Sequence, residues 1–312
     1  MKRTILLAVI MLRSAFPLFA QDSTDLMSKL ESGAAKTEYT TATFKSTRVI
    51  TGHSVENIGK GVLDVRILHR FAPLNKGLYD FFGLDIASMR LGFDYGITNN
   101  IMIGIGHSTW QKTYDAFLKV KILKQSTGAV NMPVTLSFLS TMAVRTELAK
   151  KDSLNNRILV GFGDRTSFTE QIIIGRKFSN RFSMQLMPTF IFHHNRIDSI
   201  NFYTKNKDNL ITGNNRKSTF AIGIGGRLKI SRRVSINAEY YYQLPDTKPD
   251  KKFNSVSLGV DIETGGHVFQ LHLTNSNGMS EKSLISDTDD KWKDGYIRIG
   301  FNISRVFHVS RH

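Results

Sequence analysis

Nine histidines are the first residues of this sequence to test for metal or nucleophilic chemistry. His193 and His194 are adjacent, and neighbouring residues of a strand point to opposite faces, so this pair is poorly placed to bind one ion. Ser54 follows His53 with the same unfavourable spacing, and no Gly-x-Ser-x-Gly stretch marks a nucleophile elbow. Histidines at 53, 69 and 107 come from separate segments, and their convergence on a metal ion stays open.

Two glycine-rich stretches resemble phosphate loops only superficially. Gly-x-Gly occurs at 161–163 and at 223–225, but neither stretch has the lysine followed by serine or threonine that holds a phosphate. Both stretches lie on or beside predicted strands, where glycine gives room and curvature. The chain has no cysteine, which excludes thiolate chemistry and disulfides. We therefore expect no enzymatic activity, no cofactor and no resident metal.

The charged residues have the more informative spacing, because they recur at every second position. In RLGFDYG, Arg90 and Asp94 alternate with Leu91 and Phe93. A period of two is typical of a β-strand with one apolar face and one polar or small-residue face. A short turn at 98–100 and the alternating stretch IMIGI that follows it complete a predicted hairpin.

The same alternation continues to the end of the chain and predicts about 12 strands, each roughly nine to twelve residues long. Soluble strands usually have about five or six residues, whereas a strand tilted across a membrane needs about ten. The predicted connections alternate between short turns and long loops, as in outer-membrane barrels. The expected fold class is therefore all-β, an antiparallel transmembrane β-barrel over residues 62–312. A soluble β-sandwich is the alternative.

The N-terminal 61 residues precede the first predicted strand of the barrel. Residues 1–20 predict a signal peptide, because Lys2 and Arg3 precede an apolar run and Ala20 offers a small residue at the cleavage site. Residues 21–61 form either a loose periplasmic tail or a plug folded into the barrel. An even strand number with tight periplasmic turns places both termini in the periplasm and the barrel in the outer membrane of a Gram-negative-type bacterium.

The formal net charge of +16 raises the question of a nucleic-acid partner. The predicted export of the chain argues against such a partner, and so does the spread of lysine and arginine along the whole sequence. We expect no nucleic-acid binding. The partners expected are outer-membrane lipid and, through a basic interior, a small anionic solute.

Several stretches resemble an uncharacterised family of outer-membrane β-barrels, domain of unknown function 5777. They are STRVITGHSVENIGKGVLDVRILHRF (46–71), FFGLDIASMRLGFDYGITNNIMIGIG (81–106), KTYDAFLKVKIL (112–123), GGHVFQLHLTNSNGM (265–279) and GFNISRVF (300–307). The resemblance covers most of the chain that follows the predicted signal peptide. It implies a barrel and export, and it implies no substrate, reaction or catalytic residue.

Charged residues on the polar parity of the strands are expected to line the lumen, and basic ones outnumber acidic ones. The set is Arg66, Arg70, Arg90, Asp94, Lys119, Lys121, Arg227, Glu239, Asp261 and Arg298. Such a lumen predicts a passive, porin-like channel for small and preferentially anionic solutes. The alternative is a closed structural or docking barrel that binds a periplasmic or surface partner without conducting.

Overall fold

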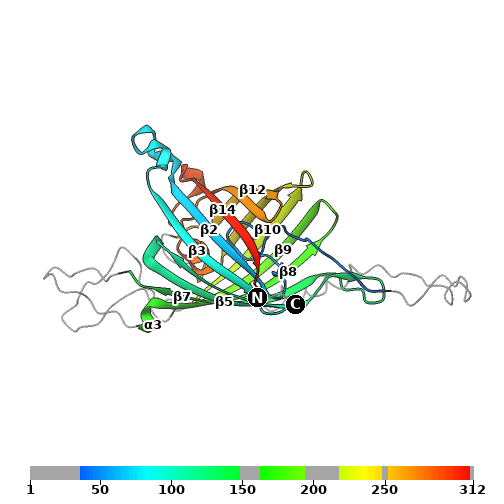
Figure 1. The fold of residues 1–312 in the computed structure, drawn as a ribbon. Coiled ribbons are helices and arrows are strands. Elements are labelled where there is room, and N and C mark those ends of the chain that lie inside the picture. Colours follow the sequence, from blue (N-terminus) through cyan, green and yellow to red (C-terminus); the bar gives the residue numbers. More distant parts are fainter. Residues whose placement is uncertain (1–35, 148–161, 194–217, 248–251, 310–312) are drawn as a thin grey trace, which may run out of the picture.

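The fold is a closed antiparallel β-barrel (Figure 1), described here from a computed structural model of residues 36–147, 162–193, 218–247 and 252–309. Within these residues, twelve strands follow one another around the barrel, and β14 pairs with β2 to close it. The strands are β2 (Val62–Pro73), β3 (Ala87–Gly96), β4 (Ile101–Ser108), β5 (Thr113–Leu123), β7 (Thr135–Arg145), β8 (Thr166–Lys177), β9 (Phe182–His193), β10 (Ser218–Lys229), β11 (Val234–Gln243), β12 (Ser255–Thr264), β13 (His267–Thr274) and β14 (Arg298–His308). The barrel predicted from the alternating pattern is confirmed.

Eight shorter elements lie in the connections and before β2. They are β1 (Glu38–Tyr39), β6 (Ser126–Thr127), η1 (Leu74–Lys76), η2 (Leu78–Gly83), η3 (Trp110–Lys112), η4 (Trp292–Asp294), α3 (Phe162–Arg165) and α4 (Glu281–Ser286). In Figure 1, η1 and η2 rise above the barrel between β2 and β3. No helix in the described part of the chain has both the length and the apolar character needed to cross a membrane.

The alternation in sequence becomes an alternation of faces. On β3 and β4, the apolar residues Phe93 and Ile105 are exposed on the outside of the barrel, and Ile105 exposes 61% of its surface. Arg90 and Asp94 lie on the opposite face and are buried. An apolar outer face and a polar inner face are typical of a barrel whose outside contacts lipid. Closing the sheet also leaves no unpaired strand edge in the hydrocarbon.

The connections divide the barrel into a short-turn end and a long-loop end. The β3–β4, β8–β9, β10–β11 and β12–β13 connections are tight turns on the first side. The β12–β13 turn needs only Gly265 and Gly266, which both adopt positive φ angles that suit glycine. β2 begins and β14 finishes at the short-turn end, where the Val309 amide donates to the Gly61 carbonyl at 2.9 Å. The β5–β7 connection at this end is longer than the other turns because it contains β6, which pairs with β1.

A polar barrel interior filled by two segments of the chain

All ten charged residues expected to line the lumen lie on the inward-facing side of their strands. Eight of them are no more than 4% exposed: Arg66, Arg70, Arg90, Asp94, Lys119, Arg227, Glu239 and Asp261. Lys121 and Arg298 lie near strand ends and are half-buried. The ten residues therefore all face the barrel interior, but they take part in several separate contacts and do not form one cluster.

Some of these side chains pair with other side chains of the wall. Arg90 of β3 forms a two-pronged ion pair with Asp115 of β5, in which Nε donates to Oδ1 at 2.9 Å. Arg66 donates to Asp64 at 3.1 Å on the same strand. Asp261 of β12 accepts from Gln270 of β13 at 2.9 Å. These contacts are formed entirely between residues of the barrel wall. Several other inward-facing charged side chains have no such partner in the wall.

Residues 42–58, here called the plug, run through the barrel interior and supply the missing partners. Most of the plug is buried, including Phe44, Val49, Ile50, His53 and Val55. A barrel of eight strands has an interior that side chains can just fill, so a barrel of twelve strands leaves room for a further segment. Of residues 21–61, the stretch 42–58 therefore lies inside the barrel, and residues 21–35 lie outside the described part of the chain.

The centre of the plug is a tight hairpin whose tip contacts the wall at Glu239. Ser54 donates its amide to the Thr47 carbonyl at 2.9 Å, and Val49 donates to the Gly52 carbonyl at 2.8 Å. At the tip, the amides of Ile50, Thr51 and Gly52 donate to the Glu239 carboxylate at 3.3, 3.0 and 3.1 Å. Three backbone donors converging on one carboxylate form a charge-assisted contact that fixes the position of the tip.

The tip requires glycine for steric reasons. A Cβ added to Gly52 would lie 2.1 Å from the hydroxyl oxygen of Tyr241 on β11. A similar fit occurs on the wall at Gly175 of β8, where an added Cβ would lie 2.6 Å from Val55 Cγ1. Plug and wall are therefore shaped to each other on both sides of the contact.

Four basic side chains of the wall donate to oxygen atoms of the plug. Arg66 binds the hydroxyls of Ser46 and Thr47 at 3.0 Å each. Arg70 binds the Thr51 hydroxyl at 2.7 Å, and Lys119 binds the Ser54 carbonyl at 3.2 Å. Arg227 binds the carbonyls of Ala42 and Thr43 at 2.8 and 3.1 Å. The plug oxygens that accept from these cations all belong to uncharged groups.

Three uncharged wall residues that the sequence analysis missed also hold the plug. Gln185 of β9 accepts from the Val55 amide at 3.1 Å and donates to the His53 carbonyl at 2.7 Å. Gln270 donates to the Val49 carbonyl at 3.0 Å, and Asn302 of β14 donates to the Ile50 carbonyl at 2.7 Å. Their position on the polar parity of the strands was the signal that could have identified them.

A second segment enters the interior from the long-loop end. It is the β13–β14 connection, whose helix α4 buries Leu284 and Ile285 completely. The side chain of Glu281 in α4 lies 3.5 Å from Nε2 of His53. Burial lowers the pKa of His53, and the nearby Arg48 lowers it further, while burial raises the pKa of Glu281. The plug and the α4 loop thus meet inside the barrel at His53 and Glu281.

The three histidines that could have formed a metal site do not converge. His53 is in the plug, whereas His69 stacks on Phe301 and His107 packs against Tyr114, both through the outer face. No group of three or more metal-ligating side chains occurs within the described ranges.

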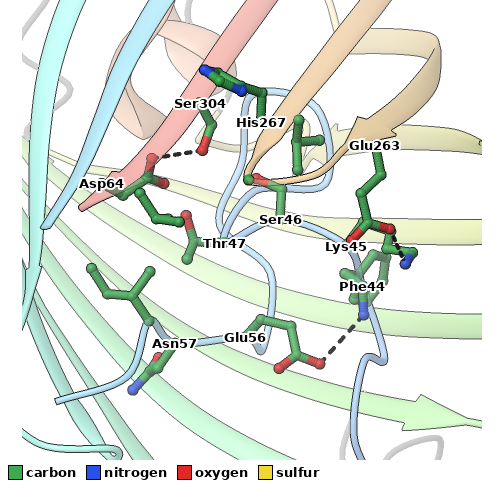
Figure 2. A pocket seen from close by; sticks show the side chains of 14 residues that line it. Phe44, Lys45, Ser46, Thr47, Glu56, Asn57, Asp64, Glu263, His267 and Ser304 are labelled. Carbon is green, nitrogen blue, oxygen red and sulfur yellow. Dashed lines mark hydrogen bonds and ion pairs between the residues drawn. The ribbon is translucent and has the colours of Figure 1, made fainter. Parts of the chain in front are cut away.

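A cavity of about 270 Å³ lies between the plug and the wall near the short-turn end (Figure 2). It is bordered by plug residues on one side and by the ends of β2, β12, β13 and β14 on the other. Lys45 of the plug pairs with Glu263 at its edge, and Ser304 donates to Asp64 at 2.6 Å. The plug therefore does not fill its end of the barrel completely.

Residues 44–307 match the family model described as "Membrane bound beta barrel domain (DUF5777)". The chain belongs to this family. The match begins within the plug and finishes in β14, so the family domain includes both the wall and the segment inside it. Among curated proteins, none matches this chain.

Solved structures similar to this family member include two porins and one channel. A NanC porin structure has a TM-score of 0.47 at 9% identity and covers 79% of this chain and 98% of its own. A KdgM porin has a TM-score of 0.45 at 8% identity, covering 79% and 99%. An outer membrane channel from Pseudomonas putida F1 has a TM-score of 0.47 at 12% identity, covering 81% and 98%.

Proposed function

We propose that this protein is a porin-like channel of the outer membrane for small solutes, with a preference for anions, and that the described structure is its closed state. The observation that carries the proposal is the inner wall. Its strands present ionisable and polar side chains to an interior that is wider than those side chains can fill. Rings of basic side chains in a pore favour anions. The proposal assigns no enzymatic step to the barrel.

The closure is compatible with a channel because the two inserts contribute no strand to the barrel. Every wall strand pairs with two other wall strands, so the backbone hydrogen bonds of the wall do not depend on the plug or on α4. Removing either insert would expose polar side chains to water. The proposal also includes export by a signal peptide in residues 1–20 and an orientation with the short-turn end in the periplasm.

The second candidate function is a closed docking barrel. The number of hydrogen bonds between plug and wall favours this function. The wall holds the plug through one carboxylate that accepts from three plug amides, through three carboxamide side chains and through four basic side chains, so the plug is well anchored. Such a barrel would bind a partner through its long loops and would never open.

Recording the refolded chain of residues 21–312 in planar bilayers with a salt gradient separates these functions. A channel is expected to give discrete current steps and a reversal potential whose sign shows that anions permeate better than cations. An inserted barrel that stays silent, both intact and after removal of its N-terminal segment, would contradict the channel and leave the docking barrel.

A further inference from the structure

Among the described residues, three buried cations of the wall have no carboxylate within ion-pairing distance. They are Arg70, Lys119 and Arg227, and all three are buried. Arg66 and Arg90, in contrast, each pair with an aspartate of the wall. Buried charges are costly unless they are paired, so these three cations depend on uncharged hydrogen-bond acceptors in the interior.

The plug accepts hydrogen bonds from all three cations, and it offers them neutral oxygens; Arg70 also donates to Asn302 Oδ1 and to the His69 carbonyl of the wall, at 3.0 Å each. The acceptors are the Thr51 hydroxyl for Arg70, the Ser54 carbonyl for Lys119 and the Ala42 and Thr43 carbonyls for Arg227. A hydrogen bond from a cation to a carboxylate or phosphate oxygen is stronger than one to a neutral oxygen. An anionic solute could therefore satisfy these donors better than the plug does.

The route of the chain allows the plug to leave without disturbing the barrel. Before the plug, the Thr40 amide donates to the Gln125 carbonyl in the β5–β7 connection at 2.8 Å. After it, the Gly61 amide donates to the Gly96 carbonyl at the start of the β3–β4 turn, also at 2.8 Å. Both anchor points lie at the short-turn end, so the plug is a loop that enters and leaves through one opening.

We propose that the plug is the gate of the channel and that its oxygen atoms occupy the positions of the oxygens of an anionic solute. Arg70, Lys119 and Arg227 then have two roles. They hold the plug in the closed state, and they bind the carboxylate or phosphate oxygens of the solute in the open state. This inference rests on the proposed channel function and names its gate and its selectivity residues.

A reversible disulfide between plug and wall tests the gate. The chain has no cysteine, so Val55→Cys with Gly175→Cys introduces the only thiols. An added Cβ at 175 lies 3.3 Å from Cβ of Val55, and disulfides have Cβ separations of about 3.5–4.5 Å, so the bond needs only a small adjustment. We expect no current from the oxidised variant in a planar bilayer and anion-selective steps after reduction. The single variant Val55→Cys, treated identically, controls for the oxidant.

Neutralising two of the three cations tests the selectivity residues. In the reduced double-cysteine background, Lys119→Gln with Arg227→Gln should lower the anion-to-cation permeability ratio measured with potassium chloride. Arg176→Gln is the matched control, because Arg176 lies on the exposed face of β8 and should leave the ratio unchanged.

Competition by an anion can be measured without any current. Val55 is 1% exposed, so the rate at which a maleimide labels Val55→Cys reports how often the plug leaves. Replacing chloride by citrate at equal ionic strength should raise this rate by about tenfold, the effect of about 1.4 kcal/mol. An unchanged labelling rate would overturn the idea that solute oxygens replace plug oxygens.

The outcomes distinguish the gate from the channel itself. Equal currents before and after reduction would overturn the gate and leave the channel function intact. Silence of the wild type, of the reduced variant and of a chain lacking residues 21–58 would overturn the channel and, with it, the gate. Current only in the shortened chain would support the plug as the closing element.

Discussion

The contact between Glu239 and the plug tip yields the most quantitative prediction, for the substitution Glu239→Gln. The two carboxylate oxygens accept three backbone N–H groups, with Oε1 serving Thr51 and Oε2 serving Ile50 and Gly52. A glutamine offers one oxygen and one NH₂ group of the same size. Whichever way its amide is oriented, at least one backbone N–H then faces another donor.

The magnitude follows from that lost acceptor. Leaving one buried donor unsatisfied costs about 1–3 kcal/mol, and each 1.4 kcal/mol changes an equilibrium about tenfold. The closed state should therefore become roughly 5–150 times less favoured relative to the released plug. The wall strands keep their pairing, so the loss falls on the closed state, and the barrel with the plug released should keep its own free energy of unfolding.

The assay is maleimide labelling of Val55→Cys with and without Glu239→Gln in vesicles. The expected result is an acceleration within that range. Glu170→Gln is the control, because Glu170 lies on the outward parity of β8 and accepts from the Ser140 hydroxyl at 2.8 Å, a bond that glutamine can still accept. Equal labelling rates for the Glu239→Gln and control chains would refute the assignment of Glu239 as the anchor of the plug tip.

Three further predictions concern the tip, the membrane face and the second insert. Gly52→Ala should accelerate labelling of Val55→Cys because the new Cβ meets the Tyr241 hydroxyl, and adding Tyr241→Phe should partly reverse the effect; no rescue would argue against that clash. Leu118→Arg, mid-strand on the exposed face of β5, should destabilise the barrel in urea by about 2–4 kcal/mol, and Ile122→Arg near the strand end by about 0–1 kcal/mol. Equal costs at the two positions would be inconsistent with a lipid-facing strand. Leu284→Ala should destabilise the packing of α4 inside the barrel by about 2–5 kcal/mol and should therefore speed tryptic cleavage at Lys282. Unchanged cleavage would mean that the inward position of the loop does not depend on this side chain.

The wall of the barrel could be predicted from the sequence because a period of two is a local signal. Each strand shows the alternation by itself, as Arg90 and Asp94 do between Leu91 and Phe93, and neighbouring strands repeat it. The direction of the charged side chains follows from the same parity, so Lys119 and Arg227 lie inside as expected.

The contents of the barrel could not be predicted in the same way. The plug has no regular period, and the reason for Gly52 appears only when Tyr241 of a distant strand is placed beside it. The β13–β14 connection is a long loop at the long-loop end, yet its helix α4 folds inward and buries the adjacent apolar residues Leu284 and Ile285. Such contacts depend on the closed barrel, and a local pattern does not encode them.

Removing the plug tests the central claim most directly. The chain without residues 21–58 begins just before β2 and retains all twelve wall strands. Single-channel recording of this chain in a planar bilayer, with a potassium chloride gradient, should show long-lived open steps and a reversal potential on the anion-selective side. A barrel that inserts and resists denaturation as the full chain does, yet passes no current, would contradict the claim that the plug closes a conducting, anion-selective interior.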